Sequence, residues 1–173
     1  MIYKIILLLL ITACTNLYAK GVYQQPDEFI AQAFNGEPPP PAVIWIKGEL
    51  KQQIEKILQH KNKYRRARYW QKAQRSVWVL KEVGKKEPIT VGIIIDENKI
   101  SQLKVLEFRE SRGWEVRYPF FTKQFKQVSL KEDNNLNETI DGISGATLSV
   151  RALRKLARIA LLLNKTIHQD ASK

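Results

Sequence analysis

The stretch that decides the fold lies near the carboxyl end of the chain and reads Asp141-Gly142-Ile143-Ser144-Gly145-Ala146-Thr147-Leu148-Ser149. It starts with a turn-forming Asp-Gly pair, continues in small and hydroxylated residues, and is followed by a long amphipathic run from Val150. This order is typical of a helix start, for which Asp141 and Ser144 are the candidate N-cap residues. The sequence therefore predicts a long C-terminal helix with small residues in its first turn.

The predicted helix start also has the chemistry of an anion site. With Ser144 as the cap, the N–H groups of Gly145, Ala146 and Thr147 have no acceptor inside the helix, and the macrodipole favours negative charge beside them. The two small residues leave room for a bulky group, and Thr147 adds a hydroxyl. The stretch is thus a candidate phosphate site with an adjacent alcohol. An ordinary capped helix with a glycine turn is the alternative interpretation.

The pattern Asp-Gly-x-Ser-Gly-Ala-Thr at positions 141–147 resembles the flavinylation motif of the FMN-binding domain family. That family is related to the C subunit of sodium-pumping NADH:quinone reductase and the G subunit of the Rnf electron-transport complex. In it, a flavin transferase joins the phosphate of FMN to the Thr of Ser-Gly-Ala-Thr through a phosphoester. The resemblance implies FMN as the cofactor and Thr147 as its covalent attachment point, with Ser149 a less favoured acceptor. The surrounding binding motif would be Asp141, Gly142, Ser144, Gly145 and Ala146.

The resemblance further implies a short, stand-alone bacterial form of the domain, an impression to which residues 109–122 add. Its expected function is that of an electron-transfer carrier with one FMN, rather than a stand-alone enzyme, and no catalytic residue is assigned. A flavin transferase and a membrane or extracytoplasmic redox protein are the implied partners. Two alternatives stay open, a flavoenzyme with its own small substrate and a non-redox binding protein without flavin.

Residues 1–19 have the pattern of an export signal. Lys4 supplies the positive charge, and the apolar run from position 5 to 11 is too short to span a bilayer permanently. Two cleavage sites compete: residues 11–14 resemble a lipobox ending at Cys14, and residues 17–19 resemble an ordinary signal-peptidase site. Both predict a periplasmic or extracytoplasmic domain over residues 20–173, either soluble or a lipoprotein anchored through Cys14.

Composition and charge limit which classes of protein and binding site remain possible. The 173 residues suit one domain with a single core, since 44% are hydrophobic and 27% are charged. The net charge of +12 falls to +11 without residues 1–19, whose one charge is Lys4. It favours acidic partners or anionic lipid, and no nucleic-acid recognition motif is visible. His60 and His168 are isolated, and Cys14 is the only cysteine, so no metal site is predicted.

Periodicity predicts an α+β fold, with a small antiparallel-rich sheet packed by helices. We expect helices at 26–36 and 48–60, and strands at 43–46, 68–72, 76–81, 89–95 and 100–108. Alternating apolar residues at 89–95 bury one face of a strand, and Ile94 indicates cover on the second face as well. The C-terminal helix is the natural candidate for that cover.

Three further segments each allow two interpretations. The basic cluster at 61–68 is either a docking patch or a solvated loop, and the aromatic stretch at 114–125 either packs beside a flavin ring or fills the core. The third is a basic stripe on the last helix, which either docks an acidic partner or anionic lipid, or faces water. Its members are Arg151, Arg154, Lys155 and Arg158.

Overall fold

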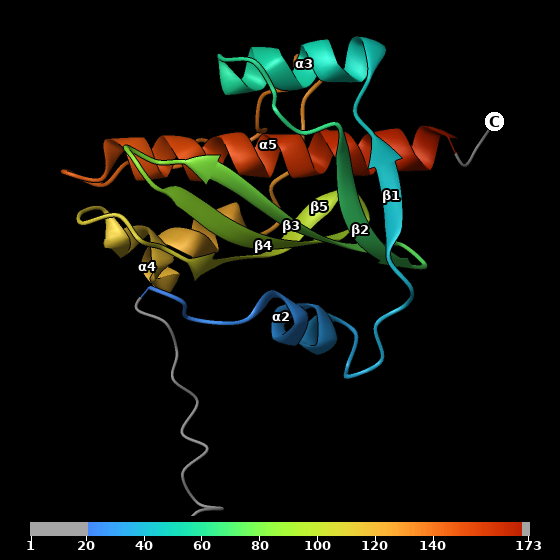
Figure 1. The fold of residues 1–173 in the computed structure, drawn as a ribbon, viewed down its shortest axis with the longest axis horizontal. Helices are drawn as coiled ribbons and strands as arrows, with labels where there is room; N and C mark the ends of the chain where they lie inside the picture. Colours follow the sequence, from blue (N-terminus) through green and yellow to red (C-terminus); the bar gives the residue numbers. More distant parts are fainter. Residues whose placement is uncertain (1–20, 171–173) are drawn as a thin grey trace, which may run out of the picture.

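A computed structural model of the protein describes residues 21–170. Its elements in chain order are α2 (Pro26–Ala33), β1 (Ala42–Trp45), α3 (Gly48–Leu58), β2 (Arg66–Lys72), β3 (Arg75–Val83), β4 (Pro88–Asp96), β5 (Lys99–Glu107), η1 (Trp114–Arg117), α4 (Pro119–Thr122), η2 (Lys123–Phe125) and α5 (Thr147–Asp170). Figure 1 shows the long helix α5 lying across the sheet. The predicted α+β class is confirmed.

The five strands form one antiparallel sheet in the order β1-β2-β3-β4-β5, so every strand pairs with its neighbour in the chain. The β4–β5 turn at 97–98 has two residues with positive φ, Glu97 at 49° and Asn98 at 65°. Positive φ at both central residues is the requirement of the type I′ turn, whose twist matches that of the paired strands. The predicted strands and this hairpin are therefore present.

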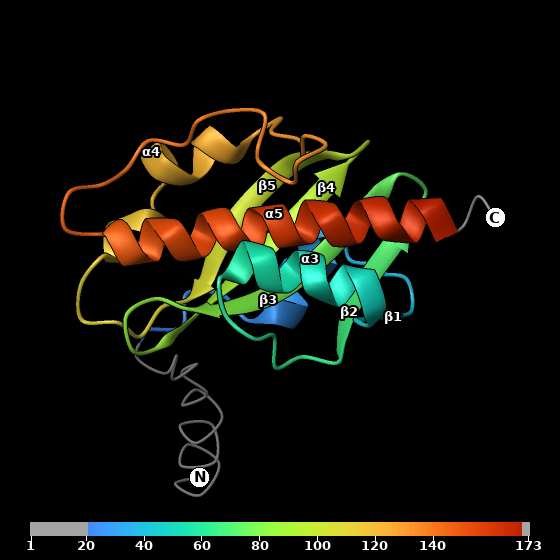
Figure 2. The ribbon, with the colours of Figure 1, turned by 90° about the horizontal axis from the view of Figure 1, so that it is seen from above.

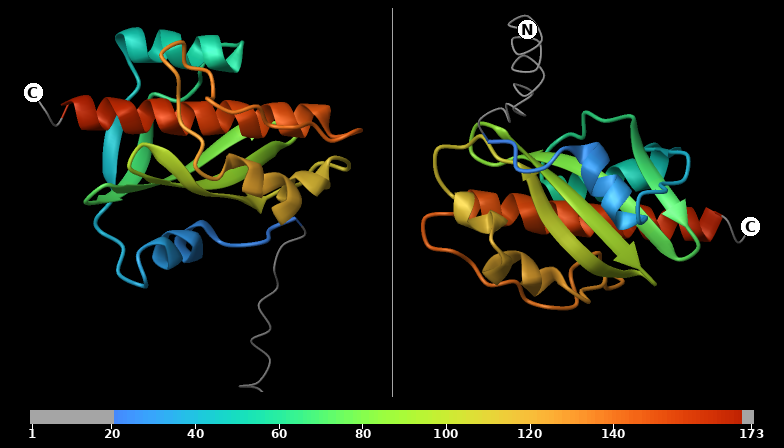
Figure 3. Two further views of the ribbon diagram at one scale, coloured as in Figure 1. Left: turned by 180° about the vertical axis from the view of Figure 1, so that it is seen from behind. Right: turned by 90° about the horizontal axis from the view of Figure 1, so that it is seen from below.

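The sheet is covered on both faces by different helices. Helices α5 and α3 lie over one face, and α2 lies under the other (Figures 1, 2 and 3). Along β4, the residues 89, 91, 93 and 95 join the α5 side of the core, whereas Ile94 packs with Phe29 of α2. The second-face cover indicated by Ile94 is thus correct, but its assignment to the C-terminal helix was wrong. Helix α2 supplies it, because α5 is already committed to the opposite face.

A buried polar network fixes the C-terminal half of α5 to the sheet. The Ser76 hydroxyl donates to Asn164 Oδ1 at 2.6 Å and accepts from Trp78 Nε1 at 2.9 Å, and Asn164 Nδ2 donates to Asn98 Oδ1 at 2.9 Å. Ser76, Trp78 and Asn164 are fully buried. Because a buried polar group without a partner costs about 1–3 kcal/mol, this network specifies one register of α5 on the sheet.

The aromatic stretch 114–125 divides between core and surface. Phe121 and Phe125 are fully buried and pack edge to face, with ring centroids 5.7 Å apart. Trp114, Tyr118 and Phe120 are exposed. The core interpretation therefore holds for Phe121 and Phe125 and fails for Trp114, Tyr118 and Phe120.

The remaining sequence predictions concern the export signal, membrane helices and metal sites. The predicted export signal and Cys14 lie outside residues 21–170. Within that range no helix combines the length and apolar character that a membrane crossing needs, and no three potential metal-ligating side chains gather into a cluster.

Candidate functional site

The start of α5 lies later than the sequence predicted, by two residues if Ser144 is taken as the cap and by five if Asp141 is. The Val150 N–H donates to the Ala146 carbonyl at 2.9 Å, which places Ala146 in the cap position and Thr147 first in the helix. The predicted N-caps Asp141 and Ser144 were therefore wrong. A turn takes up the intervening residues, because the Ala146 N–H donates to the Ile143 carbonyl at 3.0 Å and Gly145 adopts a φ of +82°. A glycine with positive φ at the third position is typical of a type II turn.

This shift moves the predicted anion site without removing it. The N–H groups that lack an acceptor inside the helix are now those of Thr147, Leu148 and Ser149, since the Ala146 N–H is used in the turn. The positive end of the helix dipole coincides with the same three residues. The hydroxyl of Thr147 thus lies directly beside the groups that would stabilise a bound phosphate.

The motif residues differ sharply in exposure. Thr147 is exposed at the surface, whereas Ala146 is 2% and Ser149 is 4% exposed. The remaining members, Asp141, Gly142, Ser144 and Gly145, are all exposed. A Cβ placed on Gly142 or Gly145 would meet no atom within 4 Å, so the outer side of the turn is open to a bulky group.

Ser149 faces the protein interior. A Cβ added to Gly113 would lie 2.5 Å from Ser149 Oγ and 3.4 Å from Ala146 Cα. Gly113, the residue before η1, has a φ of +83°, which a side chain would strain. The backbone before η1 therefore approaches the first turn of α5 closely and covers the Ser149 hydroxyl. Of the two predicted acceptors, Thr147 is the accessible one.

An aromatic surface with a central cation adjoins this helix start through Gly113 and Trp114. The Arg117 guanidinium lies 4.4 Å from the ring centroid of Tyr23, 4.8 Å from that of Tyr118 and 5.3 Å from that of Trp114. Its Nη2 also donates to the Tyr118 hydroxyl at 3.0 Å. Tyr23 was missed by sequence reasoning, because nothing in the sequence links it to residues some ninety positions away.

The basic stripe of α5 mostly points towards the protein's own backbone. Arg154 donates to the Ile140 carbonyl, Arg158 Nε donates to the Asn134 carbonyl at 2.6 Å, and Lys155 donates to the Leu58 carbonyl. Arg151 remains exposed. Three of the four side chains thus hold neighbouring segments against the helix, and two of these contacts fix the loop that leads into the motif. Docking of an acidic partner or anionic lipid to the stripe stays a prediction.

The fold and the helix start define a small α+β domain with an exposed turn, which is the candidate anion site, and an adjacent aromatic surface. Comparison with protein families matches residues 84–162 to the FMN-binding domain. The chain therefore contains an FMN-binding domain, and FMN is the cofactor it takes. The matched range begins in the β3–β4 turn and ends within α5, so it includes η1 and the whole motif. Neither a search of curated proteins nor a search of solved structures finds a match.

The residues at the start of α5 fit the phosphate end of FMN. The open side of Gly142 and Gly145 leaves space for the group, the three unpartnered helix N–H groups favour its charge, and the Thr147 hydroxyl is within the same turn. The exposed rings of Trp114 and Tyr118 meet edge to face, with centroids 5.6 Å apart, and each offers an apolar ring face against which an aromatic ring system can pack. When bound, FMN supplies reversible electron transfer, and the protein supplies attachment and orientation.

Proposed function

We propose that the protein is an exported electron carrier that holds one FMN through a phosphoester to Thr147. The observation that carries this proposal is the contrast between two hydroxyls in one helical turn. Thr147 is exposed where α5 begins, and Ser149 is 4% exposed beneath Gly113. An attaching enzyme needs access to the acceptor oxygen, and Thr147 offers that access.

Attachment would change the protein in a defined way. The donor would be an activated FMN whose phosphate is held in an anhydride. The bond between the Thr147 Oγ and the phosphorus forms as the anhydride P–O bond breaks, and the second phosphate leaves as the hydroxyl gives up its proton. The protein then carries one FMN less one water. The phosphate keeps a negative charge after esterification. The N–H groups of Thr147 and Leu148, together with the helix dipole, would stabilise that charge.

Export and electron exchange complete the proposal. The signal-like pattern of residues 1–19 supports a location outside the cytoplasm, with Cys14 as the lipid anchor in the lipoprotein form. A covalent tether suits that location because it removes the dissociation of the cofactor. Exposure of Trp114, Tyr118 and Phe120 supports a surface at which a membrane or extracytoplasmic redox partner approaches the flavin.

The intact mass of the exported protein tests the attachment, measured with and without a co-expressed flavin transferase. We expect a gain of one FMN less one water only with the transferase. Thr147→Ala should abolish the gain, and the matched variant Ser149→Ala should keep it. A gain that survives Thr147→Ala would contradict the proposed acceptor. A colourless protein of unchanged mass would instead favour a binding protein without flavin.

A second measurement separates carriage of electrons from attachment alone. The loaded protein should be reduced and reoxidised repeatedly without loss of flavin, as followed by its visible absorbance. A flavin that washes off the wild-type protein during purification would contradict the covalent tether.

A further inference from the structure

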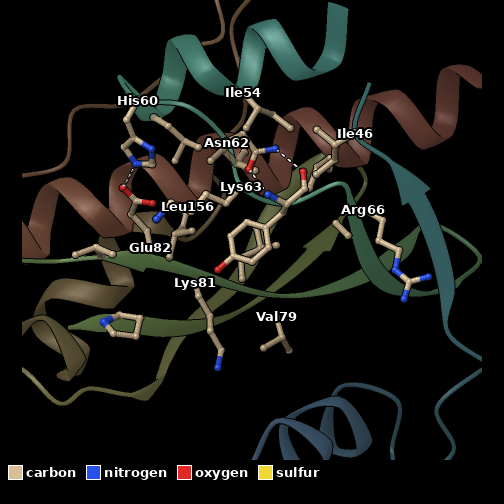
Figure 4. A pocket seen from close by; sticks show the side chains of 18 of the residues that line it. Ile46, Ile54, His60, Asn62, Lys63, Arg66, Val79, Lys81, Glu82 and Leu156 are labelled. Atoms are coloured by element: carbon tan, nitrogen blue, oxygen red, sulfur yellow. Dashed lines mark hydrogen bonds and ion pairs between the residues drawn. The ribbon is translucent and has the colours of Figure 1, made fainter. Parts of the chain in front are cut away.

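A pocket of about 670 Å³ lies on the α3 and α5 face of the sheet (Figure 4). Its volume falls within the range of roughly 300–1,000 Å³ that is usual for small-molecule sites. The floor is aliphatic and comes from three elements, which are α3, β3 and α5. Its members include Ile54, Leu58, Leu80, Leu156, Ile159 and Leu163.

This pocket is separate from the helix start that carries the flavin motif. None of its lining residues belongs to positions 141–149. The first α5 residue in its lining is Leu156, nine positions after Thr147, which corresponds to about 14 Å along the helix axis. The pocket is therefore a candidate site distinct from the helix start.

Positive charge surrounds the entrance. The rim carries five exposed cationic side chains, all within the segments 61–68 and 79–83. They are Lys61, Lys63, Arg66, Arg68 and Lys81. Four of these residues belong to the basic cluster at 61–68, which the sequence allowed to be either a docking patch or a solvated loop.

The carboxylate in the lining is already neutralised. Glu82, which is 8% exposed, lies 3.0 Å from His60 Nε2 and 3.5 Å from Lys155 Nζ. The hydrogen bond to Glu82 raises the pKa of His60, which favours its charged form beside the pocket. In the described part of the chain, no second carboxylate joins this lining. The pocket thus presents an aliphatic interior and a cationic entrance, where Lys81 lies 4.0 Å from Glu107, which is outside the lining.

We propose that this pocket binds a long-chain carboxylate, with the alkyl chain on the aliphatic floor and the carboxylate at the basic rim. A chain is favoured over a flat ring because Ile and Leu side chains make the floor, and the described lining holds only two aromatic rings, those of His60 and Tyr64. The anionic head is favoured because Lys and Arg provide charge-assisted hydrogen bonds to carboxylate oxygens.

Calorimetric titration with dodecanoate, below its micellar concentration, tests the proposal. Dodecyltrimethylammonium has the same chain with a cationic head, and acetate has the head without the chain. We expect dodecanoate to bind at least tenfold more tightly than either. Equal affinity for the cationic amphiphile would overturn the proposal, because the rim would then make no contribution.

Charge reversal locates the site without touching the core. The double variant Lys63→Glu, Lys81→Glu changes two exposed rim residues, and should weaken dodecanoate binding tenfold or more. The matched variant Lys72→Glu changes an exposed residue of β2 that does not line the pocket, and should alter the affinity less than twofold. Similar affinities for all three proteins would place the binding elsewhere and overturn the assignment.

The pocket and the flavin can be tested apart. Thr147→Ala removes the proposed attachment point but leaves every pocket residue in place, so dodecanoate should bind this variant with unchanged affinity. Loss of dodecanoate binding in Thr147→Ala would make the pocket part of the flavin site and overturn this inference. The proposed function would be unaffected by that result.

Discussion

The two ends of α5 differ in how completely their groups are satisfied. At the C-terminal half, Leu161 is 2% exposed, and fully buried Asn164 is bonded to both Ser76 and Asn98. At the start, Thr147 is exposed, Leu148 is 39% exposed, and the first N–H groups have no acceptor within the helix. One helix therefore carries a locked end that specifies the fold and an open end that is available for chemistry.

The buried contacts along α5 offset the small free-energy cost of its open end. The first N–H groups of α5, which lack an acceptor in the helix, and the conformational entropy that Gly145 loses on folding each disfavour the folded state modestly. They persist because the apolar face of α5 is buried along the rest of its length, at about 1.5–3 kcal/mol for each large aliphatic side chain. Substitutions at the two ends should consequently separate stability from function.

Matched leucine truncations give the largest expected contrast. Leu161→Ala should lower the free energy of unfolding by about 2–5 kcal/mol, because it opens a cavity in the core. Leu148→Ala makes the same chemical change at a residue that is 39% exposed, and should cost less than about 0.5 kcal/mol. Urea denaturation of both variants measures the difference. Equal losses would show that the start of α5 is as tightly packed as its second half.

Two glycines sharpen the comparison at the open end itself. Gly113 and Gly145 have nearly the same φ, 83° and 82°, so an alanine brings the same backbone strain of about 1–2 kcal/mol at either position. Their surroundings differ, because a Cβ on Gly113 meets Ser149 Oγ at 2.5 Å and one on Gly145 meets nothing. Gly113→Ala should therefore be the less stable variant by a further 1–3 kcal/mol or so, as judged by denaturant midpoints.

A rescue experiment isolates that contact. Adding Ser149→Ala to Gly113→Ala removes the nearest atom and leaves the next contact, Ser149 Cβ, at 3.3 Å. The double variant should recover part of the lost stability, whereas Ser149→Ala added to Gly145→Ala should recover none. Equal stability of the two single glycine variants would mean that η1 does not cover Ser149 in solution.

Sequence reasoning succeeded where a pattern is local. The alternation at 89–95 and the helical spacing after Val150 are set by which faces are buried, so the strands, the hairpin at 97–98 and the α+β class were predictable. The motif at 141–147 identified the FMN-binding domain because it is contiguous.

Sequence reasoning failed where contacts between distant residues determine the structure. Helix α2 rather than α5 covers Ile94. The sequence pattern of β4 indicates that both faces of the strand are buried, but it does not say which helix covers which face. The start of α5 moved to Thr147, because the Ile143–Ala146 turn competes with the helix for the same backbone groups. The Ser76–Asn164 bond joins residues 88 positions apart and leaves no periodic signal. Pairings of this kind become visible only when the chain is folded.

The smallest expected effect is a pH-dependent change in the free energy of unfolding from the Arg75–Asp96 pair, which lies beside the β4–β5 turn that bonds the locked end through Asn98. Arg75 binds Asp96 in a bidentate pair, with distances of 2.8 and 3.1 Å, and also donates to the Ala33 carbonyl at the end of α2. The hydrogen bonds from Arg75 hold the pKa of Asp96 below its usual value, despite partial burial, which acts in the opposite direction. The folded state therefore binds the Asp96 proton more weakly than the unfolded state, so the stabilisation is present above about pH 4 and is lost as the pH falls through the folded pKa.

Asp96→Asn measures this contribution. The side chains are 41% exposed for Arg75 and 33% exposed for Asp96. Solvent screening therefore limits the contribution of the pair to the free energy of unfolding to about 1 kcal/mol or less. Near pH 7 the wild type should be the more stable protein by that amount, and the difference should shrink towards zero as the pH falls through the folded pKa of Asp96. A double-mutant cycle with Arg75→Gln assigns the effect to the pair, since Asp96→Asn should then cost almost nothing at any pH. A difference that stays constant from neutral to strongly acidic pH would instead show that Asp96 acts through packing at the hairpin rather than through its charge.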